Sequence, residues 1–163
     1  MRPTYTRTLW LTAWTIWLFD YATKAWALTS LSPQPRQIFG SLLQLTLVKN
    51  SGAAFNLAAG FTAIFTALAV AVVVTIVRYA SRLTSRGWAT CAALLLGGVL
   101  GNLTDRIFRE PGFFSGHVVD WIQIPHWPVF NLADIAITSA ALFAVILTVR
   151  NIPPISPSPT EVQ

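Results

Sequence analysis

Long apolar stretches separated by short polar ones dominate the chain. A helix that crosses about 30 Å of hydrocarbon needs about 20 mostly apolar residues, and four stretches have nearly this length. They cover residues 9–28, 61–77, 88–104 and 130–149. The pattern predicts an all-α integral membrane protein with four transmembrane helices, forming one polytopic domain over residues 1–151.

The segments between these stretches follow other patterns. Residues 43–48, Leu-Gln-Leu-Thr-Leu-Val, alternate apolar and polar positions, which is the period of a half-buried strand. Residues 111–128 are aromatic and punctuated by Pro and Gly, a composition typical of chain that lies along a membrane interface. We expect a small extramembrane β-structure and a loop or helix beside it. Residues 152–163, with four prolines, predict a disordered tail.

Composition supports a membrane protein. The 163 residues are 54% hydrophobic and only 10% charged, and the mean hydropathy is +0.58. Soluble domains carry about 25% charged residues, so this chain lacks the polar residues for a water-facing surface. The single cysteine excludes a disulfide framework and a CxxC metal site. We expect no metal, no cofactor and no nucleic-acid partner, and we expect a monomer surrounded by membrane lipids.

Basic residues near the helix ends predict the orientation. Cytoplasmic loops carry an excess of Lys and Arg. Three of the flanking regions are basic, and their residues are Arg2, Arg7, Arg78, Arg82, Arg86 and Arg150. The opposite side carries Arg36, Lys49, Arg106 and Arg109, so the bias is modest. This distribution places both termini in the cytoplasm and residues 29–60 and 105–129 on the periplasmic side.

The first apolar stretch has a competing interpretation. Arg2 and Arg7, an apolar core and the sequence Ala25-Trp26-Ala27 could form a cleavable secretory signal. Asp20 and Lys24 argue against this, because they lie where such a signal would be merely small or polar. We favour an uncleaved helix.

Four acidic residues converge at one depth. In the predicted orientation Asp20, Asp105, Asp120 and Asp134 all lie at the outer side of the membrane. An ionisable group at membrane depth costs at least about 2.5 kcal/mol and is a functional suspect by default. Other polar residues fall at the same level, namely Lys24, Asn50, Asn102, Arg106 and Asn131.

Structural roles account for part of this set. Asp20 and Lys24 are spaced i, i+4 and predict a structural ion pair. Asp105 beside Arg106 predicts an ion pair at a helix end. Gly97, Gly98 and Gly101 have the spacing of small residues that let helices approach closely.

The remaining carboxyl groups suggest acid–base chemistry. No GxSxG elbow, Walker loop, GxGxxG or metalloprotease motif occurs. Two aspartates a few ångströms apart share one proton, so that one can deprotonate a water while the other polarises a carbonyl. Asp120 and Asp134 form the best pair, and Asn131 lies one turn before Asp134 and could orient it. The sequence does not say which aspartate holds the proton.

Five sequence blocks resemble a known family. They are Asp20-Tyr-Ala-Thr-Lys24, Asn50-Ser-Gly-Ala-Ala-Phe55, Gly97-Gly-Val-Leu-Gly-Asn-Leu-Thr-Asp-Arg106, Val118-Val-Asp120 and Phe130-Asn-Leu-Ala-Asp134. In this order they are similar to the signatures of bacterial lipoprotein signal peptidases, the signal peptidase II family. The resemblance implies a four-helix aspartic endopeptidase of the bacterial inner membrane, with a small periplasmic β-structure and an outward-facing site. It would remove the signal peptide of diacylglyceryl-modified prolipoproteins by cutting before the lipidated cysteine.

The resemblance also implies roles for individual residues. Asp120 and Asp134 would be the catalytic dyad. The residues that position substrate or dyad would be Asn50, Gly98, Asn102, Arg106 and Asn131, and the supporting residues would be Asp20, Lys24 and Asp105.

Two other functions stay open from the residues alone. The same acids could relay protons or bind a cation in a small channel or transporter, but transport needs polar groups in both halves of the membrane. A purely structural or assembly protein would leave four costly aspartates without a purpose.

Overall fold

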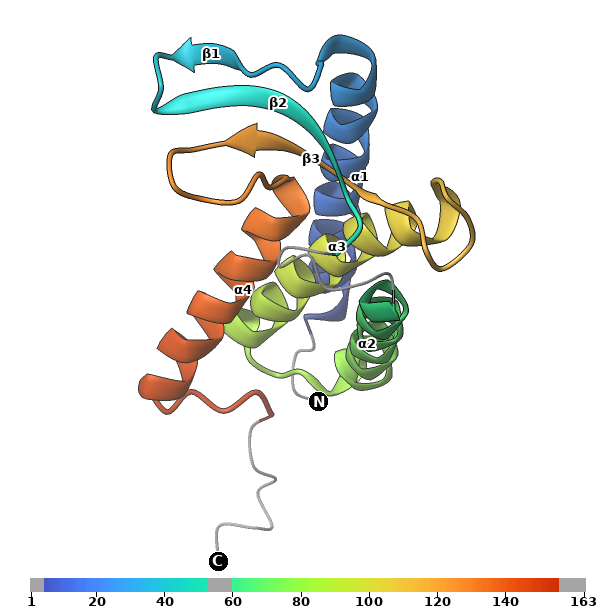
Figure 1. Ribbon diagram of the computed structural model, residues 1–163. Coiled ribbons are helices and arrows are strands. Elements are labelled where there is room, and N and C mark those ends of the chain that lie inside the picture. Colours follow the sequence, from blue (N-terminus) through green and yellow to red (C-terminus); the bar gives the residue numbers. More distant parts are fainter. Residues whose placement is uncertain (1–4, 53–59, 156–163) are drawn as a thin grey trace, which may run out of the picture.

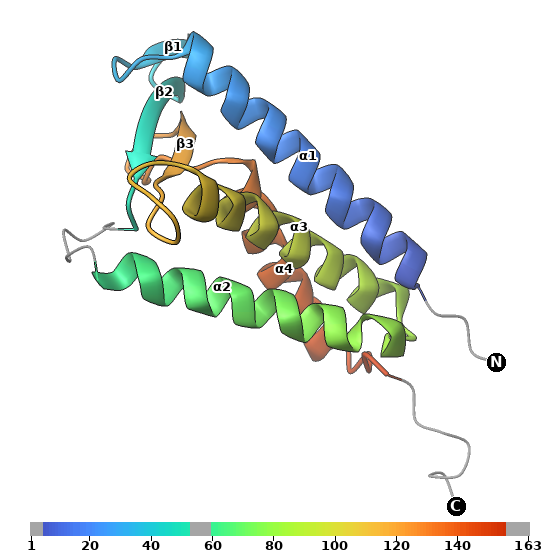
Figure 2. The same ribbon diagram turned by 90° about the vertical axis from the view of Figure 1, so that its right-hand side faces the viewer.

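The computed structural model describes residues 5–52 and 60–155 of the chain. Helices form a bundle, and a small sheet lies across one end of it (Figure 1). In chain order the elements are α1 (Thr6–Ser30), β1 (Arg36–Phe39), β2 (Leu43–Asn50), α2 (Gly60–Tyr79), the 3₁₀ turn η1 (Ala80–Arg82), α3 (Arg86–Phe108), β3 (Val118–Gln123) and α4 (Leu132–Val149). Figure 2 shows the sheet at the end of the bundle where α1 and α3 finish and α2 begins.

Each predicted apolar stretch contains a helix, with shifted ends. α1 and α3 extend beyond the predicted 9–28 and 88–104, because helices continue into the polar layers on either side of an apolar core. α4 begins at Leu132 rather than at 130, since Asn131 has an extended backbone and caps the helix. The end of α4 at Val149 is the predicted one.

Three helices of the described residues are long and apolar enough to cross a membrane: Thr62–Arg82, Arg86–Phe108 and Leu132–Val149. α1 has 25 residues but is not among them. Its apolar run is interrupted by the charges of Asp20 and Lys24 and by several Trp and Thr residues. The structure is therefore a membrane helix bundle with a small extramembrane sheet.

α3 is the central helix of the bundle and packs against α1, α2 and α4. Two neighbouring glycines make this possible on opposite sides. A Cβ atom on Gly97 would lie 2.7 Å from the Ala13 carbonyl oxygen of α1, and one on Gly98 would lie 2.6 Å from the Ala133 carbonyl oxygen of α4. Both distances are below van der Waals contact, so the helices approach as closely as they do only because these residues lack a side chain.

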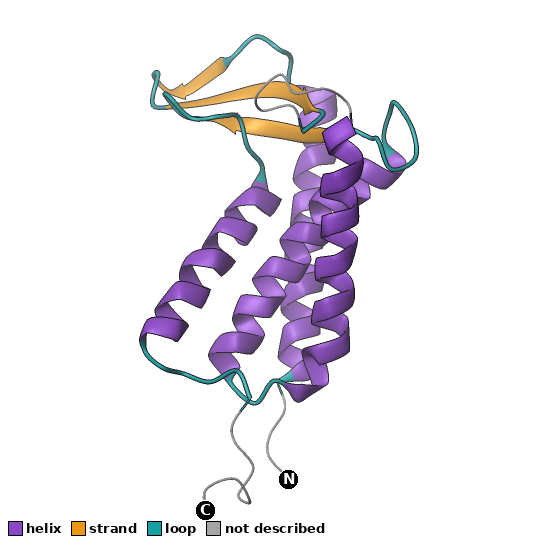
Figure 3. Cartoon of the chain, turned by 60° about the horizontal axis from the view of Figure 1, so that its bottom comes forward, coloured by secondary structure: helices purple, strands orange, loops and turns teal. Residues whose placement is uncertain are grey.

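The sheet brings its strands over the ends of α1 and α3. It is antiparallel with the order β1-β2-β3. The predicted strand over residues 43–48 lies inside β2, while β1 and β3 were not predicted individually. In the β2–β3 pair, Val48 is opposite Asp120 and Asn50 is opposite Val118. This register places Asn50 and Asp120 near the same end of the β2–β3 pair. Figure 3 shows the sheet across one end of the bundle.

Candidate active site

A cluster of buried polar side chains lies where the helices meet the sheet. Its members come from α1, α3, β3 and the start of α4, and each is at most 8% exposed: Asp20, Lys24, Asn102, Asp105, Asp120 and Asn131. Charged side chains are almost never buried to this degree unless they are paired. The partners of each group therefore decide what the cluster does.

Lys24 is the cationic centre of the cluster. Its Nζ lies 2.7 Å from Asp20 Oδ2 and 3.0 Å from Asp105 Oδ2. The same ammonium donates a hydrogen bond to Asn102 Oδ1 at 2.8 Å. One cation thus serves two buried carboxylates and fixes the orientation of an amide. The predicted Asp20–Lys24 ion pair is present, and Asp105 joins it from another helix.

Asp105 has different partners from those expected. The predicted ion pair with Arg106 is not the one that forms. Asp105 is paired with Lys24 and with Arg109, whose Nε donates to Asp105 Oδ1. The cause is helix geometry, since Arg109 lies one turn after Asp105 on the same face whereas the adjacent residue points elsewhere. The i, i+4 spacing of Asp105 and Arg109 was the signal in the sequence that could have revealed this pair.

The two structural acids also hold the backbone of neighbouring elements. Asp20 Oδ1 accepts a hydrogen bond from the Ala133 N–H in the first turn of α4, at 2.9 Å. Asp105 Oδ2 accepts one from the Val119 N–H of β3, at 3.1 Å. Sequence spacing gave no signal for either bond. Both bonds fix backbone next to the remaining aspartates.

Asp120 projects from β3 into the cluster and is 2% exposed. Its Oδ2 accepts a hydrogen bond from Asn50 Nδ2 at 2.9 Å, and its Oδ1 accepts one from Asn131 Nδ2 at 2.6 Å. Burial raises the pKa of Asp120 to about 6, and the nearby charge of Asp134 acts in the same direction. The two amide hydrogen bonds favour the ionised carboxylate and limit the rise in this pKa.

Asp134 lies in the first turn of α4, within a capping box. The Asn131 side chain accepts a hydrogen bond from the Asp134 N–H at 3.0 Å, and Asp134 Oδ2 accepts one from the Asn131 N–H at 3.1 Å. Asp134 Oδ1 also accepts a hydrogen bond from Asn102 Nδ2, at 2.8 Å. The carboxyl group is thus held by α3 as well as by its own helix.

Asn131 connects the two aspartates. Its Nδ2 donates to Asp120, while its Oδ1 and its backbone N–H bind Asp134. The structure therefore brings Asp120 and Asp134 to a single asparagine residue, although one comes from a strand and the other from a helix. Fixed amide donors aimed at two carboxyl groups are a preorganised arrangement for acid–base chemistry.

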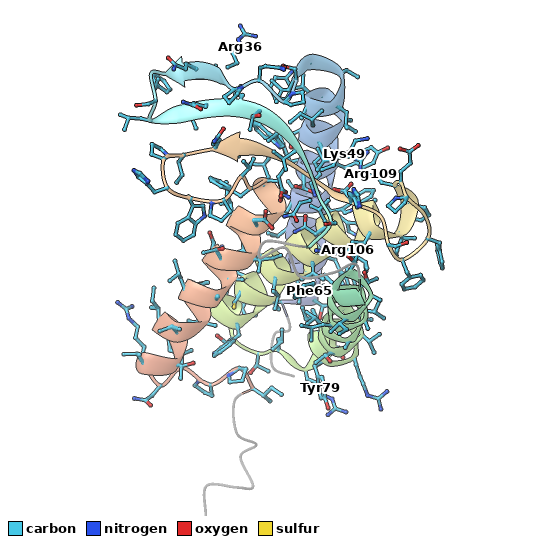
Figure 4. All side chains as sticks on the ribbon, in the orientation of Figure 1. Arg36, Lys49, Phe65, Tyr79, Arg106 and Arg109 are labelled. Atoms are coloured by element: carbon cyan, nitrogen blue, oxygen red, sulfur yellow. The ribbon has the colours of Figure 1, made fainter. Side chains whose placement is uncertain are left out.

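Arg106, whose side chain is labelled in Figure 4, is half-buried in the last turn of α3. Among the described residues no direct ion pair joins its guanidinium to an aspartate, yet the charges of Asp134, Asp120 and Asp105 all act on it. Gly98, in contrast, lies at the contact between α3 and α4.

Each of the two aspartates lines a hollow of its own. Asp120 lines a hollow of about 280 Å³ together with Asn50 and Pro128. Asp134 lines another, of about 220 Å³, whose other walls include Trp127 and Phe130. Ala53, Ala54 and Phe55 of the second sequence block lie outside the described residues, as do residues 156–163 of the predicted tail.

The fold and the site together define a helical membrane protein that carries one buried and one half-buried carboxyl group, Asp120 and Asp134, at one end of its bundle. A sequence model of the family described as "Signal peptidase (SPase) II" matches residues 12–150. The chain belongs to the signal peptidase II family. The resemblance predicted from the five sequence blocks is thereby confirmed.

Curated relatives carry the name "Lipoprotein signal peptidase". The one from Leifsonia xyli subsp. xyli is 48% identical over 139 residues, covering 84% of this chain and 64% of the relative. The one from Mycobacterium avium is 44% identical over 148 residues, covering 90% of this chain and 81% of the relative. The chain thus spans less than two thirds of the Leifsonia protein.

Solved structures share the fold. One, described as a bacterial membrane enzyme, superposes with a TM-score of 0.80 at 24% identity and covers 91% of this chain and 97% of its own. A second with the same description has a TM-score of 0.79 at 23% identity. The arrangement of helices and sheet is therefore that of a known bacterial membrane protein fold.

Proposed function

We propose that this protein is an intramembrane aspartic endopeptidase that removes the signal peptide from diacylglyceryl-modified prolipoproteins, cutting before the lipidated cysteine. Membership of the signal peptidase II family and the names of the relatives support this substrate. The observation that carries the proposal is the attachment of Asp120 and Asp134 to one residue, Asn131.

Asp120 and Asp134 are the catalytic dyad in this proposal. With one proton between them, the ionised carboxylate takes a proton from a water molecule, and the protonated carboxyl donates a hydrogen bond to the scissile carbonyl oxygen. The raised pKa of Asp120 supports its role as the group that holds the proton. The hydroxide adds to the carbonyl carbon, and the leaving amine then receives a proton as the peptide bond breaks.

The other polar residues position the dyad or the substrate. Asn50, Asn102 and Asn131 hold the carboxyl groups by the hydrogen bonds described above. Arg106 has donors available for a substrate carbonyl group. Asp20, Lys24 and Asp105 support the site by fixing Asn102 and the backbone of β3 and α4. Gly98 contributes by allowing α3 and α4 to approach.

We place α1 in the membrane as a fourth spanning helix. Asp20 and Lys24 in this helix are buried inside the protein and paired, so they do not face lipid, and its third charged residue, Arg7, lies in the first turn of the helix. Its exposed side chains include Trp14, Leu18 and Phe19. Because α1 packs against α3 and supplies Lys24 to the cluster, we infer that it is retained rather than cleaved. Both termini then lie in the cytoplasm, and the dyad lies near the outer face of the bacterial inner membrane.

The test is the removal of each carboxyl group. We expect Asp120→Asn and Asp134→Asn to lower the rate of cleavage of a purified diacylated lipopeptide by about 10³-fold, because each change removes a proton carrier. Glu110→Gln is the matched control, since it removes an exposed carboxylate and should leave the rate unchanged. Mass spectrometry of the lipopeptide measures the rate, and thermal unfolding checks that the variants fold. A dyad variant that cleaves at a near wild-type rate would show the assignment to be wrong.

A further inference from the structure

A further cavity, separate from the two hollows that the aspartates line, lies in the other half of the bundle. It occupies about 290 Å³ where α2, α3 and α4 meet. Residues of all three helices line it, among them Ile76, Cys91, Leu95, Ala141 and Ala144. The lining is almost entirely apolar, and the Cys91 thiol is already engaged by donating to the Ala140 carbonyl oxygen at 3.2 Å.

Small residues on α4 create this space. Ala140, Ala141 and Ala144 face α3 and the end of α2 without filling the gap between them. At its lower end the cavity is bordered by Trp88, whose indole Nε1 donates to the Ile152 carbonyl oxygen at 2.6 Å. Trp88 therefore bounds the cavity on the side that the proposed topology assigns to the cytoplasm. The apolar lining favours a hydrocarbon chain as the occupant.

Three residues of the cavity lining lie on the face of α4 that carries Asp134. Ile137, Ala141 and Ala144 follow Asp134 at the i+3, i+7 and i+10 positions, so they share a face with it. Ten residues of helix span about 15 Å. Half of a 30 Å hydrocarbon core is also about 15 Å, which is the depth that an acyl chain of the outer leaflet reaches. A chain whose ester group lies beside Asp134 would thus end in the cavity.

We propose that the cavity receives one acyl chain of the diacylglyceryl group of the substrate. The inference rests on the proposed function and adds to it a place for the lipid on the enzyme. A peptide or a lipid headgroup would find no polar partner among the described lining residues, whereas a methylene chain needs none.

The contribution of such a site to specificity is modest. Lipid tails are as apolar as the cavity, so binding there gains packing contacts rather than removal from water. We therefore expect the site to discriminate chain lengths by about fivefold, which corresponds to about 1 kcal/mol.

The test fills the cavity and varies the chain. Ala141 lines the cavity but has an exposed side chain, so Ala141→Phe adds a ring without displacing a buried group. Leu142→Phe is the control on the neighbouring, lipid-facing position. With a dipalmitoyl lipopeptide we expect kcat/KM of Ala141→Phe to fall about fivefold. With a dioctanoyl lipopeptide, whose chains end before the level of Ala141, it should match wild type. An equal change for both substrates, or no change for either, would overturn the proposal.

A labelling experiment locates the chain without cleavage. A dipalmitoyl lipopeptide with a diazirine at the end of one acyl chain is irradiated with the wild-type protein in phosphatidylcholine bilayers. We expect the label on peptides of α3 around Cys91 and of α4 around Ala141. Label confined to α1, or equal labelling of the cavity by a phosphatidylcholine with the same diazirine, would contradict a substrate site. If wild type cleaves neither lipopeptide, the proposed function fails, while the labelling still reports the occupant.

Discussion

The surroundings of Asp120 make it the carboxyl group whose protonation should control the reaction. Burial outweighs the hydrogen bonds from Asn50 and Asn131 and leaves its pKa at about 6. Two other charged groups act on it: Asp134, which raises this pKa, and Lys24, which lowers it. In the proposed mechanism, Asp120 carries the proton of the dyad below about pH 6, and the free enzyme loses this proton above that pH.

This protonation predicts the pH dependence of cleavage. We expect kcat/KM to fall as the pH rises through about 6, since kcat/KM reports the ionisation of the free enzyme. Bound substrate excludes water and favours the neutral carboxyl group, so the corresponding limb of kcat should lie at higher pH. Rates with a diacylated lipopeptide between pH 4.5 and 9 measure both limbs. A kcat/KM that rises through pH 6 to a plateau would mean that Asp120 acts as the base.

Substitution of Asn50 provides a way to shift the pH at which kcat/KM falls. Its amide stabilises the ionised form of Asp120, so Asn50→Ala should raise the pKa of Asp120 and shift the limb of kcat/KM upward. A hydrogen bond to a charged group contributes about 1.5 kcal/mol, or about one pH unit. Gln44→Ala removes an amide from the same strand without touching Asp120 and should leave the profile unchanged. A profile of Asn50→Ala that coincides with wild type would contradict the hydrogen-bond assignment.

At the scale of elements, the start of α4 combines a helix cap with the site. The Oδ1 atom of Asn131 accepts a hydrogen bond from the Asp134 N–H and so caps the helix. The Nδ2 atom of the same amide donates a hydrogen bond to Asp120. Serine can cap a helix but lacks the amide donor, and alanine can do neither. The two roles can therefore be separated by substitution.

We expect Asn131→Ala to lower the free energy of unfolding by about 1 kcal/mol more than Asn131→Ser does, because only alanine abolishes the cap. Both variants should lose most of the cleavage activity, since neither holds Asp120. Thermal unfolding in detergent and lipopeptide cleavage measure the two effects. Equal stability of the two variants would show that the cap contributes little, and an active serine variant would show that the donor to Asp120 is dispensable.

The elements differ in how well the sequence predicts them. Apolar runs predict all four helices, because a membrane helix needs a continuous run of a fixed length. Alternation predicts part of β2, but β3 begins with Val118 and Val119, which are both buried and hide the period. The convergence of the aspartates follows from the depth that the predicted topology gives them. The contacts of Lys24 with α3 cannot be predicted in this way, because they depend on how the helices pack.

For the whole molecule, the proposed topology places the two ends of the bundle on opposite sides of the membrane. Single cysteines in a Cys91→Ser background can report this, at Thr6, Ser41, Ser81 and Ser115. We expect a membrane-impermeant maleimide to label cysteines at Ser41 and Ser115 in intact cells. Ser41 lies between β1 and β2, and Ser115 lies between α3 and β3. Cysteines at Thr6 and Ser81 should react only after permeabilisation.

The Thr6 position decides the status of α1. Labelling of a cysteine there in intact cells would place the start of α1 on the outside and would show that α1 does not cross. Labelling of a cysteine at Ser81 in intact cells would show that α2 and α3 have the orientation opposite to the proposed one.

The spacing of the buried ion pairs has a consequence for biogenesis. Asp20 is followed four residues later by Lys24, and Asp105 four residues later by Arg109. Each nascent helix that delivers one of these carboxylates to the interior thus brings a counter-ion from its own sequence. Neither segment therefore has to enter the bilayer with an unpaired carboxylate that only a later helix could neutralise. The contact of Lys24 with Asp105 then forms between helices that are already inserted.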